Sequence, residues 1–210
     1  MKNLKLKSIL YLILFTLTLF QSLLNAEGKS DLFYTTLPGS KLWIEGTSTI
    51  KDYSCNTGIV NGYAEISNMS DIKAGIIHKD KAQISITVRA LDCGNNTMNS
   101  DMYNAMKANE FPEIKYELIN ARIISKPDSN MQFKLNTLGY LTVAGKKKLE
   151  NVKVTVEKLS NDLFRIKGSL PISMLDFDIS PPEHFLGLIK AHDNLVVYFD
   201  IIVSEGKVNQ

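Results

Sequence analysis

The strongest constraint in this sequence is a repeated alternation of apolar and polar residues in short runs. In Ala82–Leu91, the apolar residues Ile84, Ile86 and Val88 are separated by polar ones, and Glu113–Ile124 repeats the pattern. Successive side chains of a strand point to opposite faces of the sheet. Each run therefore predicts a strand with one buried face and one solvated face.

About eight runs of this kind, separated by turn-forming residues at short spacing, predict an all-β chain. The predicted strands are Lys41–Ser48, Thr57–Ile66, Ala82–Leu91, Glu113–Ile124, Met131–Ala144, Leu149–Leu159, Leu163–Ser173 and Asn194–Glu205. Thr49–Asn56, between the first two, is expected to be a loop or a single helical turn. The pattern is typical of an antiparallel barrel or sandwich, and a closed barrel of this size can hold one small or elongated ligand.

One internal stretch departs from the alternation and predicts a short helix. Its apolar stripe, spaced four residues apart, consists of Met98, Met102 and Met106. Asn99 or Ser100 is expected to cap the helix, with Asp101 in the first turn. Phe111-Pro112 is expected to end it, because a proline disfavours helical geometry in the preceding residue. The stripe either packs on a sheet or lines a ligand site at a barrel opening.

The first 26 residues have the plan of a secretory signal peptide, with a cleavage site after Ala26. Three lysines precede the apolar run Ile9–Phe20, and small or polar residues follow it. The alternative is an uncleaved membrane anchor, but the run is shorter than the roughly 20 apolar residues that span a bilayer. The predicted organisation is a signal peptide at 1–26, a lead-in at 27–40, one barrel domain at 41–205 and a tail at 206–210.

Export changes how the charge is interpreted. The whole chain has a formal net charge of +2, and removal of the three leader lysines lowers it to −1. A nearly neutral mature protein offers no electrostatic basis for binding nucleic acid. We predict an exported protein without a membrane span after cleavage, located in the periplasm or, alternatively, outside the cell.

Cys55 and Cys93 are the only cysteines of the chain. In an oxidising compartment, an isolated pair is expected to form one disulfide. The alternatives are a redox pair or metal ligands, but CxxC spacing and clustered histidines are absent from the sequence. A structural disulfide is therefore the prediction.

Four segments, in this order, resemble the YceI-like family of exported lipid- or polyisoprenoid-binding proteins. They are GTSTI at Gly46–Ile50, NEFPEIKYEL at Asn109–Leu118, LGYLTVAGKKK at Leu138–Lys148 and the long segment Leu170–Ile201. The most specific parts are the Phe-Pro-x-Ile step at Phe111–Ile114 and the G-x-L-T-x-x-G hairpin at Gly139–Gly145. The resemblance covers roughly Lys41 to Val203.

The resemblance implies a lipocalin-like antiparallel barrel with a short helix near its opening, holding an isoprenoid chain such as a quinone tail. Candidate ligand-binding residues are Met98, Met102, Tyr103, Met106, Phe111, Tyr116, Phe133 and Tyr140. All of them could also be ordinary core residues. This chain departs from the family where Ser100–Met106 replaces the usual Arg-Asp-x-His-Leu motif.

Residues that would support catalysis are sparse. His184 and His192, with Asp176, Asp178 or Glu183, are the candidates for a metal site, but they lack the close spacing of ligand pairs. The sequence has no G-x-S-x-G elbow and no glycine-rich phosphate loop. We therefore predict that the protein is not an enzyme and requires no metal or cofactor.

The predicted function is a carrier or reservoir for an isoprenoid-type lipid, such as a polyisoprenoid or quinone, with a homodimer as a possible assembly. One alternative is an envelope or surface interaction protein whose barrel is filled by its own side chains. The other alternative is a hydrolase or metal-dependent enzyme on the same scaffold.

Overall fold

The structure is a computed structural model that describes residues 32–66, 76–78, 82–129, 131–184 and 188–207. Two units divide the chain, Met1–Ser30 and Asp31–Gln210, and the described residues all belong to the second. The predicted signal peptide therefore lies outside the described residues. Among the helices that the structure describes, none has both the length and the apolar character needed to cross a bilayer.

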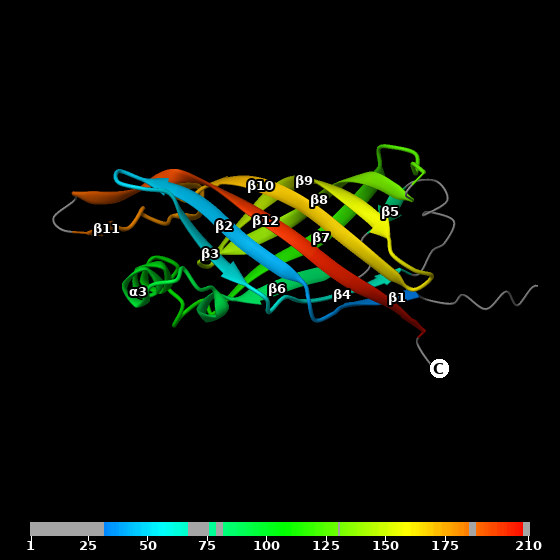
Figure 1. Cartoon of the computed structure of the whole chain (residues 1–210), viewed down its shortest axis with the longest axis horizontal. Coiled ribbons are helices and arrows are strands. Elements are labelled where there is room, and N and C mark those ends of the chain that lie inside the picture. The colour runs from blue at the N-terminus through cyan, green and yellow to red at the C-terminus, as the bar shows by residue number, and fades with distance from the viewer. Residues whose placement is uncertain (1–31, 67–75, 79–81, 130, 185–187, 208–210) are drawn as a thin grey trace, which may run out of the picture. The chain divides into compact units, whose positions relative to one another are not determined.

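The described chain consists mostly of strands (Figure 1). The strands are β1 (Leu32–Thr36), β2 (Lys41–Ser48), β3 (Tyr53–Thr57), β4 (Asn61–Ile66), β5 (Ile76–His78), β6 (Gln83–Thr87), β7 (Glu113–Ile123), β8 (Gln132–Val143), β9 (Lys146–Lys158), β10 (Leu163–Ser173), β11 (Glu183–His184) and β12 (Ile189–Lys207). The helices are α3 (Asn96–Ala105) and the short 3₁₀ turns η1 (Val88–Ala90) and η2 (Leu175–Phe177).

Antiparallel pairing closes the sheet into a barrel, which confirms the predicted fold class. The ring runs β1-β4-β6-β7-β8-β9-β10-β12 and closes because β1 pairs with both β4 and β12. β5 pairs with β7 and β11 with β12, outside this ring. Short antiparallel connections explain much of the ring, since five of its strands, β6 to β10, follow one another as neighbours along the chain and in the sheet.

The ring closes at a seam beside β12, which is built from short strands. β1 and β2 lie one after the other along the same edge of β12, and β3 pairs with β2. Beyond β3, the sheet continues through the bridge between Asn56 and Asp92. The predicted disulfide between Cys55 and Cys93 is formed directly beside this bridge. Covalent and backbone links therefore close the seam together.

The strands β1 and β3 lie in segments that were not predicted as strands. The barrel begins at Leu32 rather than at Lys41, because β1 completes the ring between β4 and β12. The segment Thr49–Asn56, predicted as a loop or turn, contains most of β3. Both strands are short. Their pairing with β4, β12 and β2 stabilises them, and their own sequences do not identify them as strands.

The helix α3 begins and ends at other residues than predicted. Its cap is Asn95, whose side chain accepts hydrogen bonds from the backbone N–H groups of Thr97 and Met98. Asp101 consequently lies in the middle of the helix rather than in its first turn. The helix ends at a left-handed residue, Lys107, before Phe111-Pro112 is reached.

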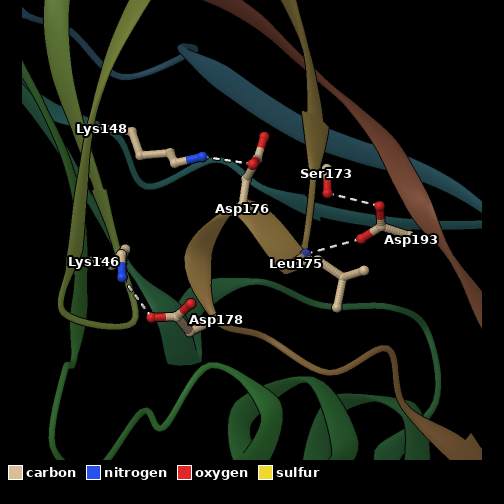
Figure 2. Close-up of polar contacts among 7 residues, drawn as sticks. All are labelled: Lys146, Lys148, Ser173, Leu175, Asp176, Asp178 and Asp193. Atoms are coloured by element: carbon tan, nitrogen blue, oxygen red, sulfur yellow. Dashed lines mark hydrogen bonds and ion pairs between the residues drawn. The ribbon is translucent and has the colours of Figure 1, made fainter.

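A plug formed by η2 and the residues beside it packs into the helix end of the barrel. Phe177 is buried against Leu141 and Val143 of β8, while Asp176 and Asp178 on either side of it point to lysines. Figure 2 shows the Lys146–Asp178 and Lys148–Asp176 pairs. The basic hairpin between β8 and β9 thus holds the plug in place.

Asp193 holds the other side of η2. Its carboxylate accepts a hydrogen bond from the Ser173 hydroxyl at 2.7 Å and another from the Leu175 backbone N–H at 2.9 Å (Figure 2). These two bonds lower the pKa of the Asp193 carboxyl below its ordinary value. The plug is therefore fixed by ionised carboxylates on both sides.

Candidate functional site: an apolar cavity in the barrel

The interior of the barrel encloses a cavity of about 850 Å³, which all eight strands of the ring and α3 line. Its wall consists mainly of inward-facing apolar side chains, such as Ile84 of β6, Val154 of β9 and Val197 of β12. The volume falls within the range of sites that hold small or elongated ligands. Inward-facing positions alternate with solvated ones, so the strand pattern of the sequence produces this wall directly.

The cavity is open because three aromatic rings lie flat against its wall. Each ring occupies the space over a glycine of the neighbouring strand, where a side chain would collide with it. The pairs are Gly46–Tyr53, Gly139–Tyr116 and Gly168–Phe199. A Cβ atom built on these glycines would lie 2.4, 2.5 and 2.4 Å from the Cζ atom of the respective rings. The glycines thereby remove aromatic volume from the centre of the barrel.

Buried polar side-chain atoms in the wall have hydrogen-bond partners. The Thr137 hydroxyl donates to the Val152 carbonyl at 2.9 Å and lies 3.1 Å from the Tyr116 hydroxyl. Burial raises the pKa of Tyr116, so its phenol stays protonated at neutral pH. Within the described part of the chain, every buried side-chain nitrogen and oxygen has a hydrogen-bond partner. The wall therefore suits a hydrocarbon better than a ligand with many polar groups.

The three methionines of α3 all line the cavity at one end. Met102 and Met106 also pack against the buried cluster around Leu91, and the Met102 sulfur lies 3.8 Å from Sγ of Cys93. Methionine side chains are flexible and polarizable, which suits a surface that adapts to irregular ligands. Tyr116 and Phe133, two further predicted residues, also line the cavity.

The other three predicted residues lie away from the cavity wall. The Tyr103 hydroxyl donates to the Leu91 and Arg89 carbonyls, so this side chain anchors α3. Phe111 packs over the Gly145 turn. Tyr140 is 40% exposed on the outer face, with the Lys147 ammonium 4.7 Å from its ring. These three side chains make structural contacts outside the cavity wall, so the cavity does not support their predicted binding role.

A polar contact at the opposite end of the cavity was missed by the sequence analysis. The Tyr34 hydroxyl donates to the Glu205 carboxylate at 2.9 Å, and both residues line the cavity. Burial and the neighbouring carboxylate raise the pKa of Tyr34. The alternation in β12 places Glu205 on the inner face, but only the pairing of β1 with β12 brings Tyr34 opposite it.

The residues considered for a metal or hydrolytic site do not converge in the structure. Asp176 and Asp178 are paired with lysines, and Nδ1 of His192 lies 2.7 Å from the Thr47 hydroxyl. The side chain of His184 lies outside the described part. Three or more His, Cys, Asp or Glu residues arranged to hold a metal ion do not occur among the described residues.

Solved structures with a similar fold include two bacterial proteins. BcnA from Burkholderia cenocepacia has a TM-score of 0.60 and 19% sequence identity, with 78% of this chain and 96% of BcnA covered. A polyisoprenoid-binding domain from Saccharophagus degradans has a TM-score of 0.63 and 13% identity, with 83% of this chain and 98% of that domain covered. At these identities, the comparison establishes a shared fold.

A search of curated protein sequences finds no match to this chain. The family model that describes the YceI-like domain, by contrast, matches residues 43–203. This range includes most of the barrel, the helix α3, the plug and the cysteine pair. On this match, the chain belongs to the YceI-like family.

Proposed function

We propose that this protein binds one isoprenoid-type lipid in its barrel and acts as a carrier or reservoir for it. The observation that carries the proposal is the apolar cavity of about 850 Å³, which the ring–glycine pairs keep open. Its wall is mainly apolar and its buried polar side-chain atoms are hydrogen-bonded, so a bound molecule would gain mainly from burial of apolar surface. The methionines of α3, with Tyr116 and Phe133, are the proposed contact residues.

Two further observations support the isoprenoid class and the exported setting. The Saccharophagus degradans domain of the same fold is described as polyisoprenoid binding. The predicted leader and the disulfide fit a protein that functions outside the cytoplasm. We propose the periplasm as its compartment, with the extracellular space as the alternative.

The structure of the cavity also favours lipid binding over the two alternative functions, an interaction protein and an enzyme. An interaction protein with a filled barrel would have its aromatic rings across the lumen, whereas here Tyr116 and Phe199 lie over glycines. Hydrolytic or metal chemistry requires converging polar groups, and the carboxylates considered for it form ion pairs with lysines instead. Binding alone requires only the apolar wall.

Native mass spectrometry of protein exported by a bacterial host, with lipid extraction of the same sample, tests the proposal. We expect a discrete added mass that matches a polyprenol or quinone in the extract. Leu135→Trp, which places a large ring on the buried inner face, should reduce this adduct. Leu149→Trp, on a side chain that is 54% exposed, is the matched control and should retain it.

A ligand-free mass that stays unchanged after incubation with polyprenol and with quinone would contradict the proposal. It would favour the interaction-protein alternative. Circular dichroism of both tryptophan variants establishes that they are folded before binding is compared. The native mass spectra also report whether the protein is a monomer or the predicted homodimer.

A further inference from the structure

Two loops that are far apart in sequence are joined at the helix end of the barrel. The Thr49 backbone N–H donates to the Lys190 carbonyl at 3.0 Å, and the Thr49 hydroxyl donates to the Leu188 carbonyl, also at 3.0 Å. These bonds connect the β2–β3 loop to Leu188 and Lys190 at the start of β12. As Figure 1 shows, β2, β3, β11 and the start of β12 meet at the same end of the barrel.

The joined loops expose two large apolar side chains. Ile50 is 64% exposed and Leu188 is 76% exposed. We refer to Ile50 and Leu188 together as the apolar tips. Exposed side chains of this size on adjacent loops are unfavourable in water unless another surface covers them.

The apolar tips are continuous with the cavity wall. Ile50 itself lines the cavity, and so does Ile189, the residue next to Leu188. Pro182, which precedes β11, also lines it, as does Met98 on the facing helix. Apolar side chains therefore line the cavity from its interior up to the exposed tips, with the charged residues Lys51 and Asp101 beside them.

Charge distinguishes this end from the opposite one. The charged residues that line the cavity near the tips are Lys51 and Asp101, one of each sign. At the opposite end they are the two carboxylates Glu65 and Glu205. A phospholipid surface is zwitterionic or anionic, so the two cavity-lining carboxylates make the opposite mouth of the cavity the less favourable one for contact with it.

We propose that the apolar tips insert into the interface of a phospholipid bilayer and place the helix end of the cavity against it. The inference deepens the proposed function, on which it rests, by identifying the surface from which a lipid would enter or leave. An isoprenoid chain would then pass from acyl chains to the cavity wall along a continuous apolar path. Insertion is driven by apolar burial, and the balanced charge gives it little dependence on anionic lipid.

Vesicle flotation of the exported protein tests the inference. We expect the protein to float with phosphatidylcholine vesicles and with vesicles that also contain phosphatidylglycerol. The double substitution Ile50→Ser with Leu188→Ser removes both tips and should weaken vesicle binding by about tenfold or more, given the free energy of burying two such side chains. Both residues are exposed, so folding should be preserved.

The opposite end supplies a matched control. Met131 and Leu159 are 52% and 44% exposed, and neither lines the cavity. The double substitution Met131→Ser with Leu159→Ser should leave flotation unchanged. Equal loss in both double variants, or no loss in the tip variant, would overturn the inference. Flotation that requires phosphatidylglycerol and disappears in high salt would also overturn it, because binding would then be electrostatic.

A separate measurement keeps this inference distinct from the proposed function. Binding of a soluble short-chain isoprenoid alcohol is titrated without vesicles, and the single substitution Leu188→Ser, at a residue that does not line the cavity, should bind it as the wild type does. A wild-type protein that binds the alcohol but does not float overturns the membrane inference alone. A wild-type protein that floats but binds no isoprenoid contradicts the proposed function instead. A homodimer that the tip variant loses, without any wild-type flotation, would identify a second copy as the partner of the tips.

Discussion

Gly139 shows how one residue determines the space inside the barrel. In the structure, its missing side chain leaves room for the ring of Tyr116, whose Cζ atom would be 2.5 Å from a Cβ atom there. The Glu117 carbonyl would lie at 2.7 Å, so the backbone also restricts this position.

Gly139→Ala should therefore turn the Tyr116 ring toward the lumen. We expect a loss of about 1–3 kcal/mol in the free energy of unfolding, since overpacking forces side chains out of their preferred rotamers. Binding of an isoprenoid should weaken at the same time. Urea unfolding and ligand titration measure the two effects.

The control for this substitution is Gly58→Ala. The nearest atom to a Cβ there is the Ser40 carbonyl oxygen at 3.9 Å, so neither stability nor binding should change appreciably. Equal effects of the two substitutions would contradict the role assigned to Gly139.

The end of α3 is an element that sequence reasoning placed incorrectly. The Ala108 N–H donates to the Tyr103 carbonyl and the Lys107 N–H to the Asn104 carbonyl. This is the Schellman arrangement, in which the residue after the C-cap is left-handed and is usually glycine. Here that residue is Lys107, with φ of 52°. The prediction failed because Phe111-Pro112 is a visible stop signal, whereas a lysine in this conformation is not.

Lys107→Gly should stabilise the protein. A left-handed conformation costs a non-glycine residue roughly 1–2 kcal/mol, and the added backbone freedom of glycine offsets part of the gain. We expect a net increase of about 0.5–1 kcal/mol in the free energy of unfolding, measured by urea denaturation. Lys107→Ala removes the same charge and keeps the strain, so it should give no such increase.

The disulfide is part of the seam that closes the barrel. It joins β3 to the residue after Asp92 and closes a sequence separation of 38 residues. Replacing both Cys55 and Cys93 by alanine should lower the free energy of unfolding by about 3–4 kcal/mol, according to the loop-entropy relation. Denaturation with and without reductant measures it. The double variant should be insensitive to reductant, and a wild type that loses no stability on reduction would contradict the prediction.

At the scale of the whole molecule, several ionised carboxylates connect the parts of the barrel. The pKa values of Asp178, Asp193 and Asp200 are lowered from 3.8, by hydrogen bonds from Lys146, Ser173 and Arg165 respectively. Asp200 lies on β12 and receives two bonds from Arg165 of β10, at 2.7 and 2.6 Å. A lowered pKa in the folded state means that the ionised form stabilises the fold.

These carboxylates predict the pH dependence of stability. Their contribution is complete well above pH 3.8 and is lost as the pH falls below this value toward the lowered pKa values of the folded state. Glu150 acts in the opposite direction, because burial raises its pKa and protonation favours the folded form. With more groups lowered than raised, we expect denaturation midpoints to decrease between about pH 5 and pH 3.

The variant Asp193→Asn should show a shallower decrease over this range, since it removes one of the titrating groups. Wild-type midpoints that stay constant down to pH 3 would contradict the prediction. The measurement follows tryptophan fluorescence, because Trp43 stacks on Tyr198 of β12 and reports on the pairing of β2 with β12.

The sequence by itself determined the local features of this protein. Alternation over neighbouring residues identified the long strands and their inner faces, and methionine spacing identified α3, because these patterns depend only on the geometry of one element. Two cysteines without other partners identified the disulfide. Met98, Met102, Met106, Tyr116 and Phe133 were likewise identified as candidates that line the cavity.

The tertiary structure decided what depends on register between distant segments. The closure of the ring through β1, the placement of Tyr116 over Gly139 and the contact between Tyr34 and Glu205 each require one strand to meet another at a particular residue. The proximity of Ile50 to Leu188 has the same origin. Periodicity gives the face of a residue but not its partner across the sheet, so an open cavity and its exposed rim became visible only when the barrel was closed.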